Sequence, residues 1–232
     1  DHRDLHVRSR RQRQMCIRDR FTLLGRCSEE LRKRVAAGWG KFHSLWPLLG
    51  KRDGDLHKRL QLFDACVSKT VLWCSESWLI TQKEKRLLQS TQNIMLRKIV
   101  GPRRGQNEDW ISWVKRSTRK ALTAARASGI RLWHDAHLRS KWHWAGHVLR
   151  MTPDRLARRG AVWRDSQWQR SEEQLPGQLR MRRPGVSRWF RWEDELRRFA
   201  DHKNWGSWQA MAQQRGRWSG ISDEFVAHTR LW

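Results

Sequence analysis

The chain has 232 residues and a formal net charge of +26, because 49 lysines and arginines face only 23 aspartates and glutamates. A chain of this length is sufficient to bury a hydrophobic core and to form one or two domains. Its charge is typical of a protein that binds a polyanion, or of a piece of a longer and better balanced chain. The longest apolar runs are only a few residues, which excludes a membrane-spanning segment, and we expect no membrane partner.

The first twenty residues, DHRDLHVRSRRQRQMCIRDR, have neither a helical nor a strand period. Every position is compatible with codons of the adapter used in transposase-made sequencing libraries, so 1–20 resembles a translated adapter. We therefore exclude it from the fold; the alternative is a basic arm that binds nucleic acid. Removing its seven arginines and three aspartates leaves 42 basic and 20 acidic side chains on 212 residues, a net charge of +22.

The cysteines that remain are Cys27, Cys66 and Cys74, an odd number without a Cys-x-x-Cys pair. This pattern is not a disulfide framework, and it favours a reducing compartment, the cytosol or the nucleus. Cys66 and Cys74 lie on the apolar side of an expected helix, so we expect both in the core rather than as reactive thiols. Most of the seventeen tryptophans are expected to be core anchors as well.

Apolar residues recur at helical spacing through the first half of the chain. Helices are predicted over Ser28–Trp46, Leu56–Trp78 and Thr81–Val100. Ser28 is the expected N-cap of the first helix and Pro47 its end. Thr81 and Glu84 form a capping box at the start of the third. The TVLW part of the second segment is also compatible with a strand, but the continuous helical spacing favours a helix.

The stretch GPRRGQNED interrupts this pattern and predicts a domain boundary between the first and second halves. Beyond it, helices are predicted over Asp109–Ser128, Ile130–Met151, Ser187–Ala200 and Trp205–Arg217, with a short one near Asp223. A loop with a short helix and the basic stretch QLPGQLRMRRPG covers 152–183. Because no alternating strand pattern is present, we expect an all-α fold of two small helical subdomains, 21–101 and 109–232, with no extensive sheet.

Four histidines lie on one predicted helix: His134, His137, His143 and His147. Their spacings place pairs on one helix face, as in some zinc sites, but no cysteine is near and no standard zinc-ligand spacing exists. We therefore predict no metal site, and expect His147 to pack or to contact phosphate. Gly146 is expected to let another helix approach closely.

Glu193, Asp194 and Glu195 form the densest cluster of acids in the chain. Adjacent positions on a helix point in different directions, so the three carboxylates do not converge on a metal or an acid–base site. Arginines flank the cluster at Arg191, Arg197 and Arg198, and we expect surface ion pairs.

Basic residues beside glycine, proline or tryptophan are the best candidates for binding, because cations contact phosphate while tryptophan stacks on bases or sugars. The candidates are Arg103 and Arg104 in a glycine-flanked loop, Lys115, Arg116, Arg119 and Lys120 near Trp113, and Arg182 and Arg183 beside Pro184. The alternative is an ordinary solvated face, which is less favourable in a chain with so many unpaired positive charges.

The segment LWCSESW, Leu72–Trp78, resembles the region just after the polymerase core in non-LTR (LINE-type) retrotransposon reverse transcriptases. There a helix ends in a Leu-Tyr-Gly-x-Glu-x-Trp-like motif; Glu76 and Trp78 match it, whereas Trp73 and Cys74 replace the tyrosine and glycine. The following LRKIVG is similar to the family's Leu-Arg-x-Ile-Leu-Gly.

Later segments extend the resemblance over nearly all of 21–232. KWHWAGHVLRM resembles a Trp-x-Gly-His-x-x-Arg box, and RRPGVSRWFRWEDELRRF resembles a Gly-Arg-Pro-x-x-Arg-Trp-x-Asp stretch. The residues that match the box are Trp144, Gly146, His147 and Arg150. The residues similar to a closing helix of the family are Trp208, Ala212, Arg215 and Trp218.

The resemblance implies that 21–101 is thumb-like and that 109–232 is a C-terminal region that engages element RNA or target DNA, with His147 and Arg150 among its contacts. The polymerase reaction requires metal-holding carboxylates, including an Asp-Asp pair, and this chain has no such pair. We therefore expect no catalysis and no cofactor in this chain, whereas the parent polymerase would use magnesium.

The implied partners are RNA or DNA, including a template–primer duplex, and an upstream polymerase domain of the same polyprotein. The implied location is nuclear or cytoplasmic. Two alternatives remain: a non-functional remnant of a decayed element, and a free-standing basic helical module that binds protein or membrane.

Overall fold

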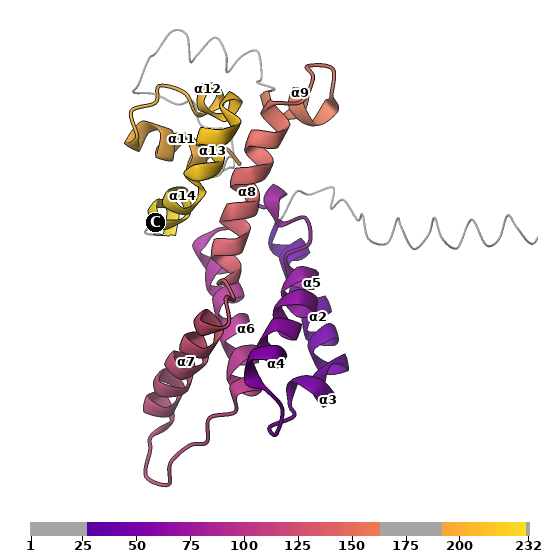
Figure 1. Cartoon of the computed structure of the whole chain (residues 1–232), viewed down its shortest axis with the longest axis vertical. Coiled ribbons are helices and arrows are strands. Elements are labelled where there is room, and N and C mark those ends of the chain that lie inside the picture. The colour runs from indigo at the N-terminus through magenta and orange to yellow at the C-terminus, as the bar shows by residue number, and fades with distance from the viewer. Residues whose placement is uncertain (1–26, 163–191, 231–232) are drawn as a thin grey trace, which may run out of the picture.

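The computed structural model describes residues 27–162 and 192–230. Within these ranges the chain is helical and has no β-strand, which confirms the all-α prediction (Figure 1). Segment 1–20 and the basic loop that carries Arg182 and Arg183 lie outside the described residues.

The helices follow one another in the chain, and most of the connections between them are short. The first half contains α2 (Cys27–Ser44), α3 (Trp46–Leu49), α4 (Leu56–Phe63), the π-helical turn η1 (Asp64–Ser68), α5 (Lys69–Val71), the 3₁₀ turn η2 (Ser75–Ser77), α6 (Gln82–Val100) and α7 (Trp110–Ala127). The second half contains α8 (Trp133–Leu149), α9 (Leu156–Val162), α11 (Asp194–His202), α12 (Trp208–Gln213), α13 (Arg215–Gly220) and α14 (Ser222–Arg230).

The first predicted helix is present as α2, but its ends differ from the prediction. Ser28 lies inside the helix rather than at its N-cap, because the helix already includes Cys27. The helix ends before Pro47, as expected, yet the chain then forms the short helix α3. Pro47 occupies the first turn of α3, where the N–H that proline lacks has no intrahelical partner to bond.

The second predicted helix is shorter than expected, since regular helix ends at Val71. A turn follows in which Cys74 adopts a left-handed conformation with φ of 56°. The TVLW stretch forms helix and turn, so the strand alternative is wrong. The prediction that Cys74 lies in the core is also wrong: Cys74 is exposed because the turn carries it away from the apolar side of the helix. Cys66, which was also expected in the core, is only half-buried.

The predicted capping box is present, and the start of α7 is also capped by a side chain. Thr81 and Glu84 form the expected box, in which the Thr81 backbone N–H donates to Glu84 Oε2 over 2.8 Å. Asp109 begins α7 by accepting hydrogen bonds from the backbone N–H groups of Ile111 and Ser112, at 2.8 and 3.1 Å. After α7 the chain turns at Gly129, whose φ of 76° suits glycine.

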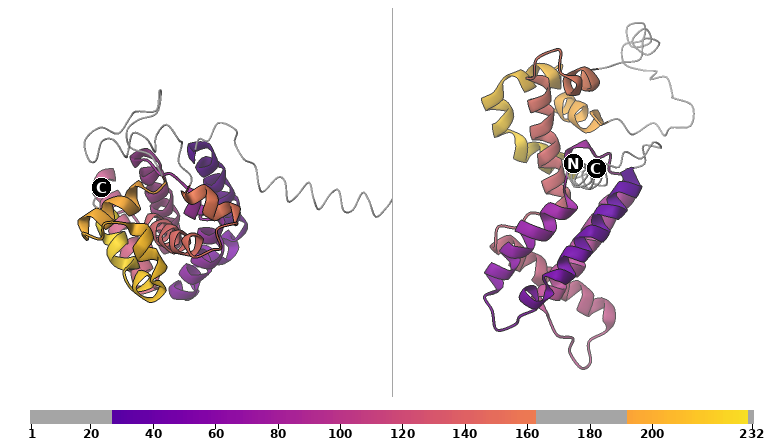
Figure 2. Two further views of the ribbon diagram at one scale, coloured as in Figure 1. Left: turned by 90° about the horizontal axis from the view of Figure 1, so that it is seen from above. Right: turned by 90° about the vertical axis from the view of Figure 1, so that its right-hand side faces the viewer.

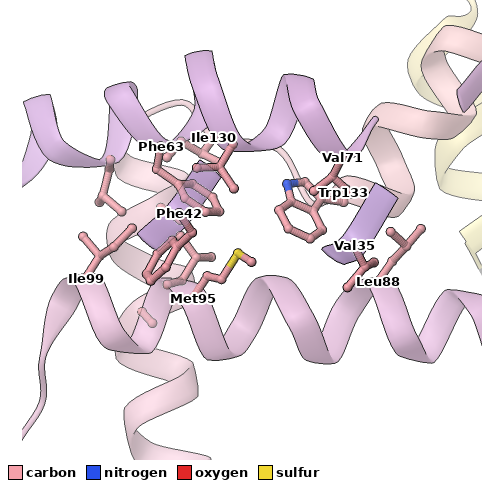
Figure 3. Close-up of a cluster of buried hydrophobic side chains, with 14 of the residues drawn as sticks. Val35, Phe42, Phe63, Val71, Leu88, Met95, Ile99, Ile130 and Trp133 are labelled. Atoms are coloured by element: carbon pink, nitrogen blue, oxygen red, sulfur yellow. The ribbon is translucent and has the colours of Figure 1, made fainter. Parts of the chain in front are cut away.

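The first hydrophobic core lies between α2, α4, α6 and α7 and ends at the first residue of α8 (Figure 3). Trp133 stacks on Phe63 with ring centroids 6.0 Å apart, and its indole N–H donates to Ser68 Oγ over 2.8 Å. Gln92 accepts the backbone N–H of Trp133 at 2.8 Å, so buried polar groups are paired there too. Ala121 and Ala125 of α7 belong to this core.

The second core forms around the remaining length of α8, packed against α11, α12, α13 and α14. Trp142 and Trp218 stack with centroids 3.6 Å apart and planes 3° from parallel. Each indole N–H donates to the other residue's backbone carbonyl, at 2.8 and 3.0 Å. A Cβ on Gly146 would lie 2.5 Å from Trp218 Nε1, so the expected close approach at Gly146 is present.

Helix α8 contributes to both cores and continues from the first into the second (Figures 1 and 2). The change from the first core to the second therefore occurs within α8, whereas the sequence predicted a domain boundary at the 101–109 loop. Helix α7, assigned to the second subdomain, packs against α6 of the first core. The division into two subdomains itself stays a prediction.

Two glycines of α2 provide a matched test of this packing. A Cβ at Gly38 would lie 2.3 Å from Cγ2 of the fully buried Val71, whereas a Cβ at Gly40 would meet nothing within 4 Å. We expect Gly38→Ala to lower the free energy of unfolding by about 1–2 kcal/mol through overpacking. Gly40→Ala should raise it by about 0.5–1 kcal/mol through helix propensity. Urea denaturation followed by circular dichroism measures both, and a rise for Gly38→Ala would contradict the close packing.

Candidate nucleic-acid interface

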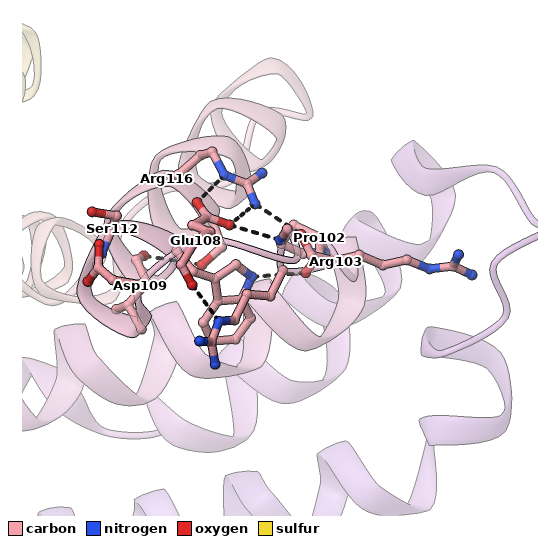
Figure 4. Close-up of polar contacts among 11 residues, drawn as sticks. Pro102, Arg103, Glu108, Asp109, Ser112 and Arg116 are labelled. Carbon is pink, nitrogen blue, oxygen red and sulfur yellow. Dashed lines mark hydrogen bonds and ion pairs between the residues drawn. The ribbon is translucent and has the colours of Figure 1, made fainter.

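The loop between α6 and α7 is held against α7 by a network centred on Glu108 (Figure 4). Arg116 donates two hydrogen bonds to the Glu108 carboxylate, each 2.7 Å long, and a third to the Arg103 carbonyl over 2.9 Å. Arg104 Nε donates to the Glu108 carbonyl over 2.8 Å. The hydrogen bonds from Arg116 lower the pKa of Glu108 to about 2, so the carboxylate is charged at neutral pH.

This network distinguishes three of the predicted binding arginines, Arg103 and Arg104 of the loop and Arg116 of α7, by what each guanidinium group contacts. The guanidinium groups of Arg104 and Arg116 bind the protein's own carbonyl and carboxylate oxygens. Arg103 contributes only its backbone carbonyl, and its side chain extends away from the loop (Figure 4). Of the three, Arg103 is therefore the one that retains an uncommitted cation for a ligand.

The outer face of α7 carries positive charge from Lys115 to Arg126. The helix has 18 residues, five of them basic and none acidic. Lys115, Arg119 and Lys120 are exposed and make no hydrogen bond or ion pair with the rest of the described chain. Positions 115 and 119 are one helical turn apart and share a face, which Arg126, not singled out from the sequence, continues.

The loop between α3 and α4, which carries Arg52, lies beside the 101–109 loop, a contact that the sequence does not reveal. Arg59 of α4 donates from one nitrogen to the carbonyls of Leu49 and Ile99, both at 3.0 Å, and so joins the ends of α3 and α6. The exposed Arg52 lies close to Gly101, where a Cβ would be 3.3 Å from its Nη2 atom. Arg52 is therefore adjacent to the 101–109 loop.

An exposed apolar group completes this end of the molecule. Trp110 and Ile111, the first two residues of α7, are 60 % and 63 % exposed. The Trp110 ring contacts Trp113, with centroids 4.8 Å apart. Trp113, the tryptophan that the sequence places near the basic residues, is only half-buried, whereas Trp110 offers the more accessible ring.

Two other predicted contacts, His147 and Arg150, lie at the C-terminal end of α8, the end away from α7 (Figure 1). His147 is exposed and its ring lies 5.6 Å from that of Trp144. Arg150 donates to the Ala212 carbonyl over 2.6 Å and so joins α8 to α12. The structure does not bring these residues together with Arg103, and Arg182 and Arg183 lie outside the described residues.

The histidines of α8 divide into a buried and an exposed pair. His134 and His137 are buried, and burial lowers the pKa of each to about 3. His137 Nδ1 lies 2.8 Å from the Ser75 carbonyl. His143 and His147 are exposed. No group of three potential metal ligands occurs in 27–162 and 192–230.

The acidic cluster forms a buried ion pair, so the expectation of surface pairs alone is wrong. Lys141 of α8 is 1 % exposed, and its ammonium group donates to Glu195 Oε2 over 2.5 Å. The Trp192 ring covers the same ammonium group at 5.5 Å. Glu193 is also buried and pairs with Arg197 at 3.1 Å. The fold, not the local sequence, supplies Lys141 as the partner.

No helix in the described ranges is long and apolar enough to cross a bilayer. Comparison of the chain with protein-family models, with curated proteins and with solved structures finds no match in any of the three.

Proposed function

We propose that the chain binds nucleic acid through one basic surface, which we name the α7 surface. Its residues are Arg52, Arg103, Trp110, Lys115, Arg119, Lys120 and Arg126. The observation that carries this proposal is the outer face of α7, which is basic from Lys115 to Arg126, on a helix that has no acidic residue. Lysines and arginines that lack a carboxylate partner are available to contact phosphates. Such contacts favour binding because they release counterions condensed on the nucleic acid.

The total charge of the chain supports the same conclusion. A net charge of +26, or +22 without residues 1–20, is unfavourable for a compact chain unless a polyanion screens it. Glu108, the acid nearest to α7 besides its N-cap Asp109, is neutralised by Arg116 and does not oppose a phosphate backbone. The exposed cations of α7 itself, Lys115, Arg119, Lys120 and Arg126, therefore face solvent without an acidic side chain on the same helix.

The proposal also includes a parent protein, which rests on the resemblance of the motifs. The chain would be the non-catalytic C-terminal part of a LINE-type reverse transcriptase, nuclear or cytoplasmic, with the metal-holding carboxylates upstream. Its partners would be that polymerase domain and the template–primer duplex, element RNA or target DNA. Sequencing of the genomic DNA upstream of the Phe21 codon tests this origin, because an uninterrupted frame with paired aspartates is expected.

A pair of double variants tests the binding surface. Lys115→Ala with Arg119→Ala removes two cations of the α7 surface, and Arg32→Ala with Lys41→Ala removes two exposed cations of α2. Figure 1 shows α2 and α7 on opposite sides of α6. Fluorescence anisotropy with a labelled RNA strand, repeated over a range of salt concentrations, gives the slope of log K against log salt. The α7 pair should lower that slope by about two, roughly one for each lost phosphate contact.

The α2 pair keeps the same net charge as the α7 pair and is expected to leave the salt slope close to that of the unmodified chain. Equal losses for both pairs would mean that attraction is general and that the α7 surface is not the site. Binding that does not weaken with salt would contradict an electrostatic interface altogether.

A further inference from the structure

The exposed ring of Trp110 has no packing role that explains its position. Trp110 is the first residue of α7, and 60 % of its surface is open to solvent. The five fully or nearly buried tryptophans of the described ranges are all in the cores: Trp78, Trp133, Trp142, Trp208 and Trp218. An exposed indole beside exposed Ile111 presents apolar area that a ligand can cover.

The ring is nevertheless supported from one side by anchored groups. Trp113 contacts the Trp110 ring at 4.8 Å, and its own indole N–H donates to the Pro102 carbonyl over 3.3 Å. The Arg97 guanidinium lies 5.9 Å from the Trp113 ring. The Asp109 cap fixes the start of the helix. Trp110 thus contacts a ring that is itself held in place by a hydrogen bond, so less conformational entropy is lost when a ligand binds.

Two cations lie close in the chain to the start of α7. Arg103 projects from the loop that Arg116 and Trp113 hold against the first turns of α7. Lys115 lies one turn beyond Ile111 on the same helix face. The two carboxylates nearby are occupied, Glu108 by Arg116 and Asp109 by the amides of the first turn. An aromatic ring next to uncommitted cations suits a base attached to a phosphate backbone.

We propose that Trp110 stacks on an unpaired base, and that the α7 surface therefore prefers single-stranded RNA or DNA. This inference rests on the proposed function and adds the substrate class. In a duplex both faces of each base are already stacked on neighbours, so an exposed indole gains contact only with an unpaired or terminal base. The phosphates on either side of that base would contact Arg103 and Lys115.

The test compares two labelled strands of equal length and equal phosphate number, oligo(dT) and a fully abasic strand. Fluorescence anisotropy at physiological salt measures the affinity of the complete chain for each. We expect the unmodified chain to bind oligo(dT) about 5- to 150-fold more tightly, the range given by stacking on one base. Trp110→Ala should bind the two strands equally, and Trp110→Phe should retain part of the preference.

Trp73→Ala is the matched control, because Trp73 is also exposed, by 55 %, but lies in the turn after α5. It should keep the preference for oligo(dT) of the unmodified chain. Circular dichroism should show unchanged helix content for each variant, since both rings are largely exposed.

The outcomes separate this inference from the proposed function. If the unmodified chain binds neither strand, the proposed function is wrong and the stacking site with it. If it binds both strands equally, or if Trp110→Ala keeps the preference for oligo(dT), binding stands and stacking at Trp110 is overturned. In that case a protein partner, not a base, would cover the exposed apolar residues at the start of α7.

Discussion

Replacing Trp142 by alanine is expected to lower the free energy of unfolding by about 3–5 kcal/mol, the usual cost of truncating a buried aromatic residue. Trp142 is fully buried and its ring stacks on Trp218 at 3.6 Å. The variant also removes the indole N–H that satisfies the Trp218 carbonyl. Because α8 belongs to both cores, we expect the loss to appear in the main unfolding transition. Urea denaturation followed by circular dichroism at 222 nm gives the free energy.

Trp144→Ala is the control for that experiment, since Trp144 is on the same helix but only half-buried, with its ring against exposed His147. Its expected cost is about 1 kcal/mol or less, as for partly exposed positions. A similar small cost for Trp142→Ala would show that the stacked pair does not hold the second core together.

Acid should destabilise the fold through His134 and His137, beginning near pH 6.5. The folded-state pKa of each is about 3 because of burial, below the value of about 6.5 for an unfolded chain. Between these values the unfolded chain binds protons that the folded chain does not. The free energy of unfolding therefore falls as pH decreases, by about 1.4 kcal/mol per pH unit for each histidine, and is unaffected by them above pH 7.

Several cations add to the effect of burial on these rings. Lys141 faces His137, and Lys85 and Arg230 face His134. His137→Phe should reduce the acid dependence of the free energy of unfolding by roughly one proton between pH 6 and pH 4. Chemical denaturation at a series of pH values measures the slope. An identical slope for His137→Phe and the unmodified chain would contradict a neutral buried His137.

The parts of the fold that local chemistry determines were predictable from the sequence. Thr81 with Glu84 begins α6, and Asp109 begins α7, because each cap needs only residues within one turn. The break after Val71 was not predictable. It coincides with the packing of Val71 against Gly38 and of Trp78 against His137, contacts that join distant segments.

The candidate site, like the fold, was only partly predictable from the sequence. Composition indicates which residues are basic, but not which of them are already bound within the protein. Arg116 is committed to Glu108 and Arg150 to the Ala212 carbonyl, and both partners are set by folding. Arg52 joins the site only through the contact near Gly101, which no local pattern contains.

Several residues of the motifs that carry the family resemblance have a packing role in the structure. Gly146 accommodates Trp218, and Arg150 binds the carbonyl of Ala212, so two separate motifs meet. The Trp192 indole donates to the Glu76 carbonyl over 2.6 Å. This hydrogen bond joins the RRPGVSRWFRWEDELRRF segment to the LWCSESW segment. These positions connect helices across the molecule, and nothing in their geometry requires a ligand.

Because α8 is shared by both cores, synthesis of the chain imposes an order on folding. The first core needs Trp133, so it cannot close until the ribosome has released the beginning of α8. The rest of α8 must then wait for Trp218 and Phe225 before its apolar side is covered. During this interval the nascent chain displays Leu138, Trp142 and neighbouring apolar groups, a surface on which chaperones or other nascent chains can bind.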